Sequence, residues 1–368
     1  MNPAESIGVL LMTYGSPETL DDIPEYMTSV RGGRPPEEGL VAEFTRRYRL
    51  IGGSPLTRIT RAQARALQVG LKRRHPGGPR FCAGIGMRFA PPHVAEGVAT
   101  LVEAGIDRLI AIVMSPQYSP IIMRGYVDAV IAAVQELERP LPVSIPGSWH
   151  AQPRFLQAIA ERVHEALAGF PAGVRDEVQV LLTAHSMPRR VVANEPVYIA
   201  QLKETARRVA ELVGLPSERW GFCYQSAGHT PEEWLKPDFA DVMPLLAAAG
   251  QRHVLIAPIQ FLADHLEILY DIEVGAREQA EEHGLSFARI ASLNTSPLFI
   301  AALADVVEME LARPAGEAPR TEAPLALRSD DCASLVAPLA SPACGDAAAP
   351  AYRGGVRPTH GGTSAAGA

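Results

Sequence analysis

The chain has 368 residues, of which 47% are hydrophobic and 20% charged, with 41 acidic against 34 basic side chains and a net charge of −7. This composition excludes a disordered or collagen-like chain, and the length predicts two domains or one large α/β unit. The negative charge argues against nucleic-acid binding, which uses a basic surface. Long apolar runs and a basic N-terminal segment are both absent from the sequence, so we expect a cytoplasmic protein without stable membrane insertion.

Short apolar runs rich in Val, Ile and Leu predict buried parallel strands. They cover residues 6–14, 108–116, 178–186 and 253–261. Other segments repeat apolar residues at three- and four-residue spacing, which predicts amphipathic helices. These segments are 58–74, 93–105, 153–169, 197–214 and 299–312. The alternation predicts a doubly wound α/β fold whose ligand lies beyond the carboxyl ends of the strands.

An internal repeat supports two similar halves. The segments that align without gaps are 9–17 with 180–188 and 113–119 with 255–261. The first alignment puts Tyr14 opposite His185. If the halves face each other, both side chains leave equivalent strand ends and point into one cleft between the domains, where ligand sites favour forming.

The expected domains follow from this repeat. We assign residues 1–155 to an N-terminal Rossmann-like lobe, 156–295 to a C-terminal Rossmann-like lobe and 296–311 to a terminal helix. Residues 312–368 are rich in Ala, Pro and Gly and contain no Ile, Phe, Trp or Met. Such a segment buries too little apolar surface to offset its ordering entropy, so we expect a disordered tail.

Residues 263–278 follow the fourth predicted strand and are expected to form a helix. Its acidic side chains at three- to four-residue spacing, beside His265, are Asp264, Glu267, Asp271 and Glu278. We expect these four to share one face. The stripe is either a solvated surface or, because it begins at the predicted cleft, a set of carboxylates that holds a cation or accepts protons.

Two further segments carry candidate chemistry. His185 ends a predicted strand, where an imidazole can act as a base or a metal ligand, and the sequence around it lacks the GxSxG pattern of serine hydrolases. Residues 45–64 combine arginines with a Gly pair and a Ser. They form either a turn before a helix with solvated arginines, or a clamp for carboxylates or phosphates. The glycines fit neither a Walker nor a GxGxxG pattern, so a nucleotide site is not indicated.

Five segments in order together resemble the ferrochelatase family: YGSPETLDDI, YRLIGGSPL, AHSMP, YQSAGHTPEEWLKPD and FLADHLEILYDIE. The similarity runs from about residue 7 to about residue 310. It implies a chelatase-like fold of two Rossmann-like lobes with a cleft between them. It also implies insertion of Fe(II) into a porphyrin as two pyrrole protons leave, with porphyrin and ferrous iron as substrates, no organic cofactor, and a monomer.

The resemblance carries specific residues over to this chain. His185 and Glu267 match the residues that face the macrocycle as metal ligand and proton acceptor. The residues that would contact the porphyrin and its carboxylates are Tyr14, Arg31, Arg47, Tyr48, Ser54 and Tyr126. An acidic position found in some relatives is Gly275 here, which speaks against an outer metal site.

Tyr14 resembles the axial tyrosine of the coproporphyrin III branch of Gram-positive bacteria, and a phenolate can ligate porphyrin-bound iron. The segment 29–39, which would form the lip of the cleft, is polar and basic and suits four propionates. We therefore expect coproporphyrin III as substrate. The alternatives are protoporphyrin IX, insertion of cobalt or nickel into an earlier tetrapyrrole, a non-catalytic porphyrin or haem carrier, and a bilobal solute-binding protein.

The cysteines argue against a [2Fe-2S] cluster, which some ferrochelatases carry. Only Cys332 and Cys344 lie late in the chain, so a four-thiolate site would need both Cys82 and Cys223. We expect no cluster and expect Cys223 to pack as a small apolar side chain.

Overall fold

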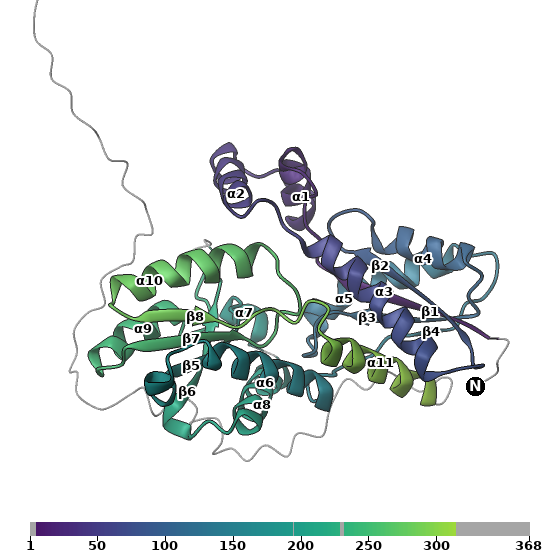
Figure 1. The fold of residues 1–368 in the computed structure, drawn as a ribbon. Coiled ribbons are helices and arrows are strands. Elements are labelled where there is room, and N and C mark those ends of the chain that lie inside the picture. Colours follow the sequence, from purple (N-terminus) through teal and green to yellow (C-terminus); the bar gives the residue numbers. More distant parts are fainter. Residues whose placement is uncertain (1–4, 194, 229–231, 314–368) are drawn as a thin grey trace, which may run out of the picture.

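The structure is a computed structural model that describes residues 5–193, 195–228 and 232–313. Its strands form two four-stranded parallel sheets, one in each half of the chain (Figure 1). The strands are β1 (Ser6–Thr13), β2 (Arg80–Met87), β3 (Arg108–Val113), β4 (Val143–Ser144), β5 (Gln179–His185), β6 (Trp220–Gln225), β7 (His253–Pro258) and β8 (Ser286–Arg289). The sheet orders are β2-β1-β3-β4 and β6-β5-β7-β8. Each half thus arranges its four strands identically, which confirms the predicted repeat and the α/β fold of two similar lobes.

The four strands predicted from the sequence are the inner strands β1, β3, β5 and β7. Inner strands are covered by helices on both faces, so they carry the continuous apolar runs that a sequence shows most clearly. The strands that the sequence analysis missed, β2, β4, β6 and β8, all lie at sheet edges. β4 has two residues and β8 four, and β2 is partly exposed, so the apolar signal of these three is weak. β6 is buried, but its sequence WGFCYQ has no run of Val, Ile or Leu.

Helices form most of the connections between the strands. They are α1 (Ile23–Val30), α2 (Glu38–Leu50), α3 (Leu56–Arg74), α4 (Val94–Glu103), α5 (Pro120–Gln135), α6 (Pro153–Ala168), α7 (Arg189–Val192), α8 (Pro196–Val213), α9 (Phe239–Ala248), α10 (Arg277–Glu282) and α11 (Pro297–Ala312). Short 3₁₀ segments occupy Leu20–Asp22, Ala172–Glu177 and Ser217–Arg219, and a π-helix spans Glu267–Ala276. The five amphipathic helices predicted from spacing correspond to α3, α4, α6, α8 and α11.

One hydrophobic core runs through both halves. Alternate residues of β1 and β5, such as Leu11 and Leu182, belong to a single buried cluster that also contains side chains of α3, α6, α8 and α11. The other faces of the two sheets have separate cores, to which Leu10 and Leu181 belong. The boundary expected at residues 155 and 156 falls inside α6, whose Phe155 and Leu156 lie in the shared cluster.

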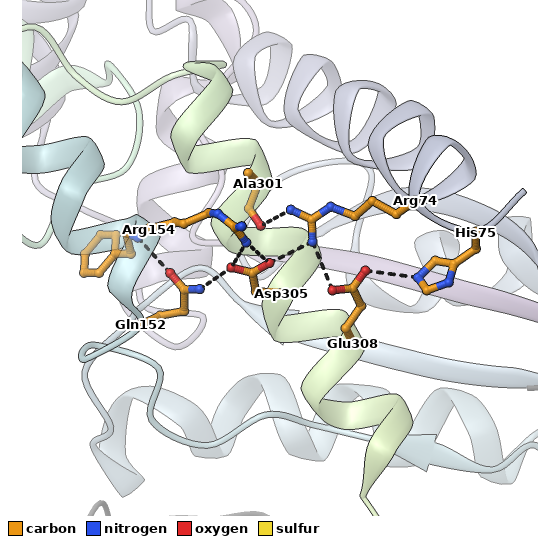
Figure 2. A network of polar contacts seen from close by, with 8 residues as sticks. Arg74, His75, Gln152, Arg154, Ala301, Asp305 and Glu308 are labelled. Atoms are coloured by element: carbon orange, nitrogen blue, oxygen red, sulfur yellow. Dashed lines mark hydrogen bonds and ion pairs between the residues drawn. The ribbon is translucent and has the colours of Figure 1, made fainter.

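Figure 2 shows a polar network that ties α11 to both α3 and α6. The Asp305 carboxylate accepts hydrogen bonds from Arg74 Nη1 at 2.7 Å and from Arg154 Nη1 at 2.6 Å. Glu308 accepts from Arg74 at 3.0 Å and lies 3.0 Å from His75 Nε2. The last helix therefore connects the two halves through charge as well as through apolar contacts.

The paired helices α1 and α2 stand apart from both sheets (Figure 1). Their own small core contains Ile23, Met27 and Tyr48, and Leu266, next to the π-helix, packs against it. The segment between β1 and α3 therefore reaches from the first half to the second.

Two sequence expectations concern the end of the chain and membranes. The predicted tail, together with Cys332 and Cys344, lies outside the described residues from 314 onward. Within the described part of the chain, no helix has the length and apolar character needed to cross a bilayer.

Candidate active site

The structure brings His185 and Glu267 together. His185 is the last residue of β5, and Glu267 is the first residue of the π-helix that follows β7. The imidazole Nε2 lies 3.4 Å from Glu267 Oε2, and each side chain keeps about a third of its surface exposed. The pair is therefore held by the protein on one side and accessible on the other.

Neighbouring groups fix the orientation of the His185 ring. Its backbone N–H donates to Gln260 Oε1 at 3.0 Å, and its Nδ1 contacts the carbonyl oxygen of Ser186. Because a carbonyl oxygen can only accept, Nδ1 carries the hydrogen, and in the neutral imidazole the Nε2 lone pair is free. That lone pair is directed to the side where Glu267 lies.

The predicted helix is confirmed for residues 267–282, but the four acidic residues do not share one helix face. Residues 267–276 form a π-helix, whose wider turn contains more residues than an α-helical turn. Asp264 precedes it and accepts hydrogen bonds from Ser292 Oγ and Asn294 Nδ2, both at 2.8 Å, so it holds loop structure. Glu278 is exposed on α10. Only Glu267 and Asp271 remain as an acidic pair.

The acidic pair sits in a partly dehydrated environment. Burial, and then the negative charge of Glu267, raise the pKa of the Asp271 carboxyl to about 6, while Arg47 opposes the shift. Arg47 Nη1 lies 3.9 Å from Asp271 Oδ1. Within the described residues, Glu267 Oε2 is buried and has no hydrogen-bond partner. A buried oxygen of this kind is available to a ligand or a proton.

Three tyrosines, Tyr14, Tyr26 and Tyr48, lie within electrostatic reach of the Glu267 carboxylate, and Tyr126 lies within reach of Tyr14. Tyr14 follows β1 and exposes 44% of its surface, whereas Tyr48 and Tyr126 are buried. Loss of hydration raises the pKa of Tyr14 to about 12, and the charge of Glu267 contributes. Burial and then, among smaller contributions, Glu267 also raise the pKa of Tyr48 and of Tyr26, whose hydroxyl donates to Gly15 O at 3.2 Å. Sequence reasoning missed Tyr26, because nothing distinguishes it from an ordinary core tyrosine of α1.

Of the other predicted contact residues, Arg47 is joined to the acidic pair through Asp271. Arg47 also bonds Glu43 at 2.8 Å, and its guanidinium lies 4.8 Å from the Tyr270 ring. Ser54 Oγ accepts the Leu56 N–H at 3.4 Å, which satisfies a free amide at the start of α3. Arg31 is exposed at the end of α1.

Arg88 is a second residue that sequence reasoning missed. It follows β2 directly, with its guanidinium 4.8 Å from the Phe89 ring and 5.5 Å from the Tyr126 ring. Phe89 in turn contacts Tyr14, with ring centroids 4.5 Å apart. A basic residue at the carboxyl end of a strand would have pointed to Arg88, but the sequence analysis did not predict the edge strand β2.

No group of three or more His, Cys, Asp or Glu side chains within the described ranges is arranged to hold a metal ion. Within the candidate site, the His185 imidazole and the Glu267 carboxylate are a pair of such donors.

Comparison with known proteins identifies the family. The family model described as Ferrochelatase matches residues 6–311, and the chain is 40% identical over 307 residues to the ferrochelatase of Deinococcus radiodurans, covering 83% of this chain and 96% of that protein. The chain belongs to the ferrochelatase family. It is also 36% identical to the coproporphyrin III ferrochelatase of Geobacillus thermodenitrificans, over 85% of this chain and 98% of that one.

A solved structure, SirB from Bacillus subtilis with Fe³⁺, shares the fold, with a TM-score of 0.52 at 12% identity and coverage of 84% of this chain and 96% of its own. The ferrochelatase assignment means that the chain is a metal chelatase that inserts iron into a porphyrin. Both curated relatives extend over the same range that the sequence motifs covered.

Proposed function

We propose that this ferrochelatase inserts Fe(II) into coproporphyrin III. The observation that carries the proposal is the exposed Tyr14 phenol, which leaves the end of β1 close enough to Glu267 for that charge to act on it. A tyrosine oxygen can ligate porphyrin-bound iron.

The His185–Glu267 pair supports the insertion chemistry. Two pyrrole N–H protons leave the macrocycle as one Fe(II) enters, so the site needs a metal donor and proton acceptors. The free Nε2 lone pair of His185 suits Fe(II), and the unpartnered oxygen of Glu267 suits a proton or the ion. Asp271, with a pKa of about 6, is suited to exchange the released proton near neutral pH.

Basic and phenolic side chains support the choice of a porphyrin rich in carboxylates. We assign the substrate contacts to Tyr14, Arg31, Arg47, Tyr48, Ser54 and Tyr126. Arg31 lies on an exposed polar segment between α1 and α2, which suits water-exposed propionates better than an apolar edge delivered from a membrane.

We further propose that the enzyme works without an organic cofactor and without an iron–sulfur cluster. Among the described residues, Cys82 belongs to β2 and Cys223 to β6, so they sit in different sheets. Cys223 is fully buried, and its burial raises the pKa of the thiol, as for a small apolar core residue.

The decisive experiment is anaerobic insertion of Fe(II), followed by porphyrin absorbance, with coproporphyrin III and protoporphyrin IX side by side in the same detergent. We expect faster turnover of coproporphyrin III. Faster turnover of protoporphyrin IX would overturn the substrate and keep the enzyme class. Tight binding of both without turnover would identify a carrier. A parallel series with Co(II) and Ni(II) tests the choice of metal.

A further inference from the structure

The outer side of helix α3 carries positive charge along most of its length. Four exposed cations recur at three-, four- and seven-residue spacing, which puts them on one side of an α-helix. They are Arg58, Arg61, Arg65 and Lys72, and we call them the basic face of α3. The opposite side, with Leu67 and Leu71, is buried in the shared core. The basic face is therefore turned to solvent and extends over about 21 Å, at about 1.5 Å per residue.

Charge is segregated along the sequence around this helix. Residues 44–95 contain eleven Lys and Arg side chains and no Asp or Glu, so all 41 acidic side chains lie outside this segment. In the part of the chain that the structure describes, no side chain of the basic face forms a hydrogen bond or an ion pair. Exposed arginines elsewhere meet carboxylates, as Arg124 meets Asp128 and Arg207 meets Glu211. The basic face therefore lacks a neutralising group of its own.

The basic face works against the stability of α3. Arg58 lies in the first turn, where the positive end of the helix dipole disfavours a cation, and this turn contains no acidic residue. Arg61 lies three residues from Arg58 and four from Arg65, and like charges at these spacings repel each other. Acidic side chains in the first turn would stabilise the helix instead. Because the cations do not serve the helix, they point to a ligand outside the protein.

The buried side of α3 contacts the segment that leads to the candidate active site. Gln63 Nε2 donates to the carbonyl oxygens of Leu262 at 3.3 Å and of Asn294 at 2.8 Å. Leu262 lies shortly before Glu267 in the chain, and the Asn294 side chain holds the Asp264 carboxylate. A molecule bound to the basic face is thus separated from this segment by the thickness of one helix, about 10 Å.

We propose that the basic face of α3 docks an acidic surface of a partner protein. The negative charge of the ligand follows from the four cations, three of which are arginines. A guanidinium forms paired hydrogen bonds with a carboxylate, which favours a row of Asp or Glu side chains. The length of the face fits such a row on one helix of the partner.

Two observations favour a protein over an extended polyanion. A membrane surface or a nucleic-acid duplex would also face the rest of the molecule, which holds all 41 acidic side chains, whereas a protein can match its acidic patch to α3 alone. Among the exposed large apolar side chains of the described residues, only Val69 belongs to α3. The helix therefore offers little to insert into a bilayer.

The test measures binding of a labelled helical peptide of about 20 residues, with glutamates on one face, by fluorescence anisotropy. The full chain is compared with the triple variant Arg58→Gln, Arg61→Gln, Arg65→Gln. We expect Kd to rise about tenfold or more in the variant, because three exposed ion pairs are lost together. Added salt should weaken binding to the full chain, since it screens exposed charges.

Two controls separate the basic face from net charge. The variant Arg124→Gln, Arg190→Gln, Arg207→Gln loses the same number of positive charges at other exposed positions and should keep Kd within about twofold. A peptide of equal composition, with its glutamates spread around the helix, should bind the full chain more weakly. Equal Kd values for both triple variants, or for both peptides, would overturn the docking face.

A charge reversal separates binding from folding. Arg58→Glu with Arg61→Glu places acidic side chains at the start of α3, so we expect a higher melting temperature together with lost peptide binding. A lower melting temperature would overturn the inference, because the arginines would then serve the fold. All these variants should insert Fe(II) at the unaltered rate, so the result is independent of the preferred porphyrin.

Three other ligands provide the opposing outcomes. Vesicles that contain phosphatidylglycerol and a short DNA duplex are titrated in the same buffer as the peptide. If the full chain binds either of them more tightly than the peptide, and the glutamine variant loses that binding, the basic face serves a membrane or a nucleic acid. If sedimentation shows a dimer of the full chain that the glutamine variant lacks, the ligand is a second copy. Each of these results would overturn the acidic partner protein.

Discussion

The His185 imidazole reaches Glu267 because two backbone segments end at the same edge of one sheet. The His185 imidazole lies at the end of β5, and the Glu267 carboxylate lies just after the neighbouring strand β7. Parallel strands put their carboxyl ends side by side, so residues far apart in sequence meet without any special loop. Histidine and glutamate are common side chains, and only their separation of 3.4 Å lets them act on one ligand together.

We expect His185→Ala and Glu267→Gln to lower the rate of Fe(II) insertion by about a hundredfold or more, the range for loss of an acid–base group. Porphyrin binding should change little, because neither residue holds the propionates. Stopped-flow absorbance measures insertion, and fluorescence measures binding. The controls are His283→Ala and Glu278→Gln, both exposed positions away from the pair. Full turnover in both site variants would contradict the assignment.

A buried histidine outside the site predicts a pH effect on stability. His150 is buried, and its Nε2 lies 3.0 Å from Glu204 Oε2. Burial lowers its pKa, although Glu204 opposes the shift. The unfolded chain then binds a proton that the native state does not bind, so the free energy of unfolding falls as pH drops below about 6.5.

We therefore expect His150→Gln to reduce the loss of stability between pH 7 and pH 5.5, as measured by urea unfolding at each pH. His283→Gln, at an exposed position, should keep the original slope. An unchanged slope in His150→Gln would show that other groups cause the pH dependence.

The π-helix is the element that shapes the acidic pair. Its wide turn keeps Glu267 and Asp271 close to each other, whereas Glu278 lies on the following helix, α10. Arg47 and Tyr270 join this element to α2, with the guanidinium 4.8 Å from the ring. Spacing rules for an α-helix cannot anticipate this arrangement, because the sequence pattern of 263–278 fits an α-helix equally well.

Gly275 provides a prediction within this element. A Cβ there would come no closer than 3.8 Å to the Tyr270 carbonyl oxygen, so alanine fits. Glycine inside a helix costs about 0.5–1 kcal/mol relative to alanine. We expect Gly275→Ala to raise the free energy of unfolding by that amount in a denaturant titration. A decrease would mean that the π-helix needs the backbone freedom of glycine.

In the whole molecule, the two lobes share one buried hydrophobic cluster. The cluster that contains Leu11 and Leu182 is continuous through α6 and α11. Asp305 of α11 adds charged contacts to α3 and α6 (Figure 2). The relative position of the two strand ends, and with it the distance from Tyr14 to Glu267, depends on this shared interior.

We expect Asp305→Ala to lower the free energy of unfolding by about 1.5–3 kcal/mol, because Arg154 loses its carboxylate partner and Arg74 keeps only Glu308. Both sheets should unfold in one transition, seen by circular dichroism and by tryptophan fluorescence. Glu211→Ala, which breaks the exposed pair with Arg207, should change stability by less than about 1 kcal/mol. Equal effects of the two variants would refute the role of the network.

Local sequence patterns were enough to predict the inner strands, the amphipathic helices and the repeat, and to recognise the family motifs. The spacing of apolar residues over a short segment shows whether that segment is buried on one face or on both. His185 could be singled out as a polar residue at a strand end, whereas Glu267 was selected from the acidic residues by the resemblance to the ferrochelatase family.

The tertiary structure alone decided the edge strands, the π-helix, the shared core and the positions of Tyr26 and Arg88. Edge strands take much of their stability from hydrogen bonds to a neighbour strand, and β2 follows β1 only after α1, α2 and α3. The π-helix and the Arg88 stack depend on contacts between segments far apart in sequence, such as Arg47 with Tyr270 and Phe89 with Tyr14. Such contacts exist only once the chain has folded, so no local pattern contains them.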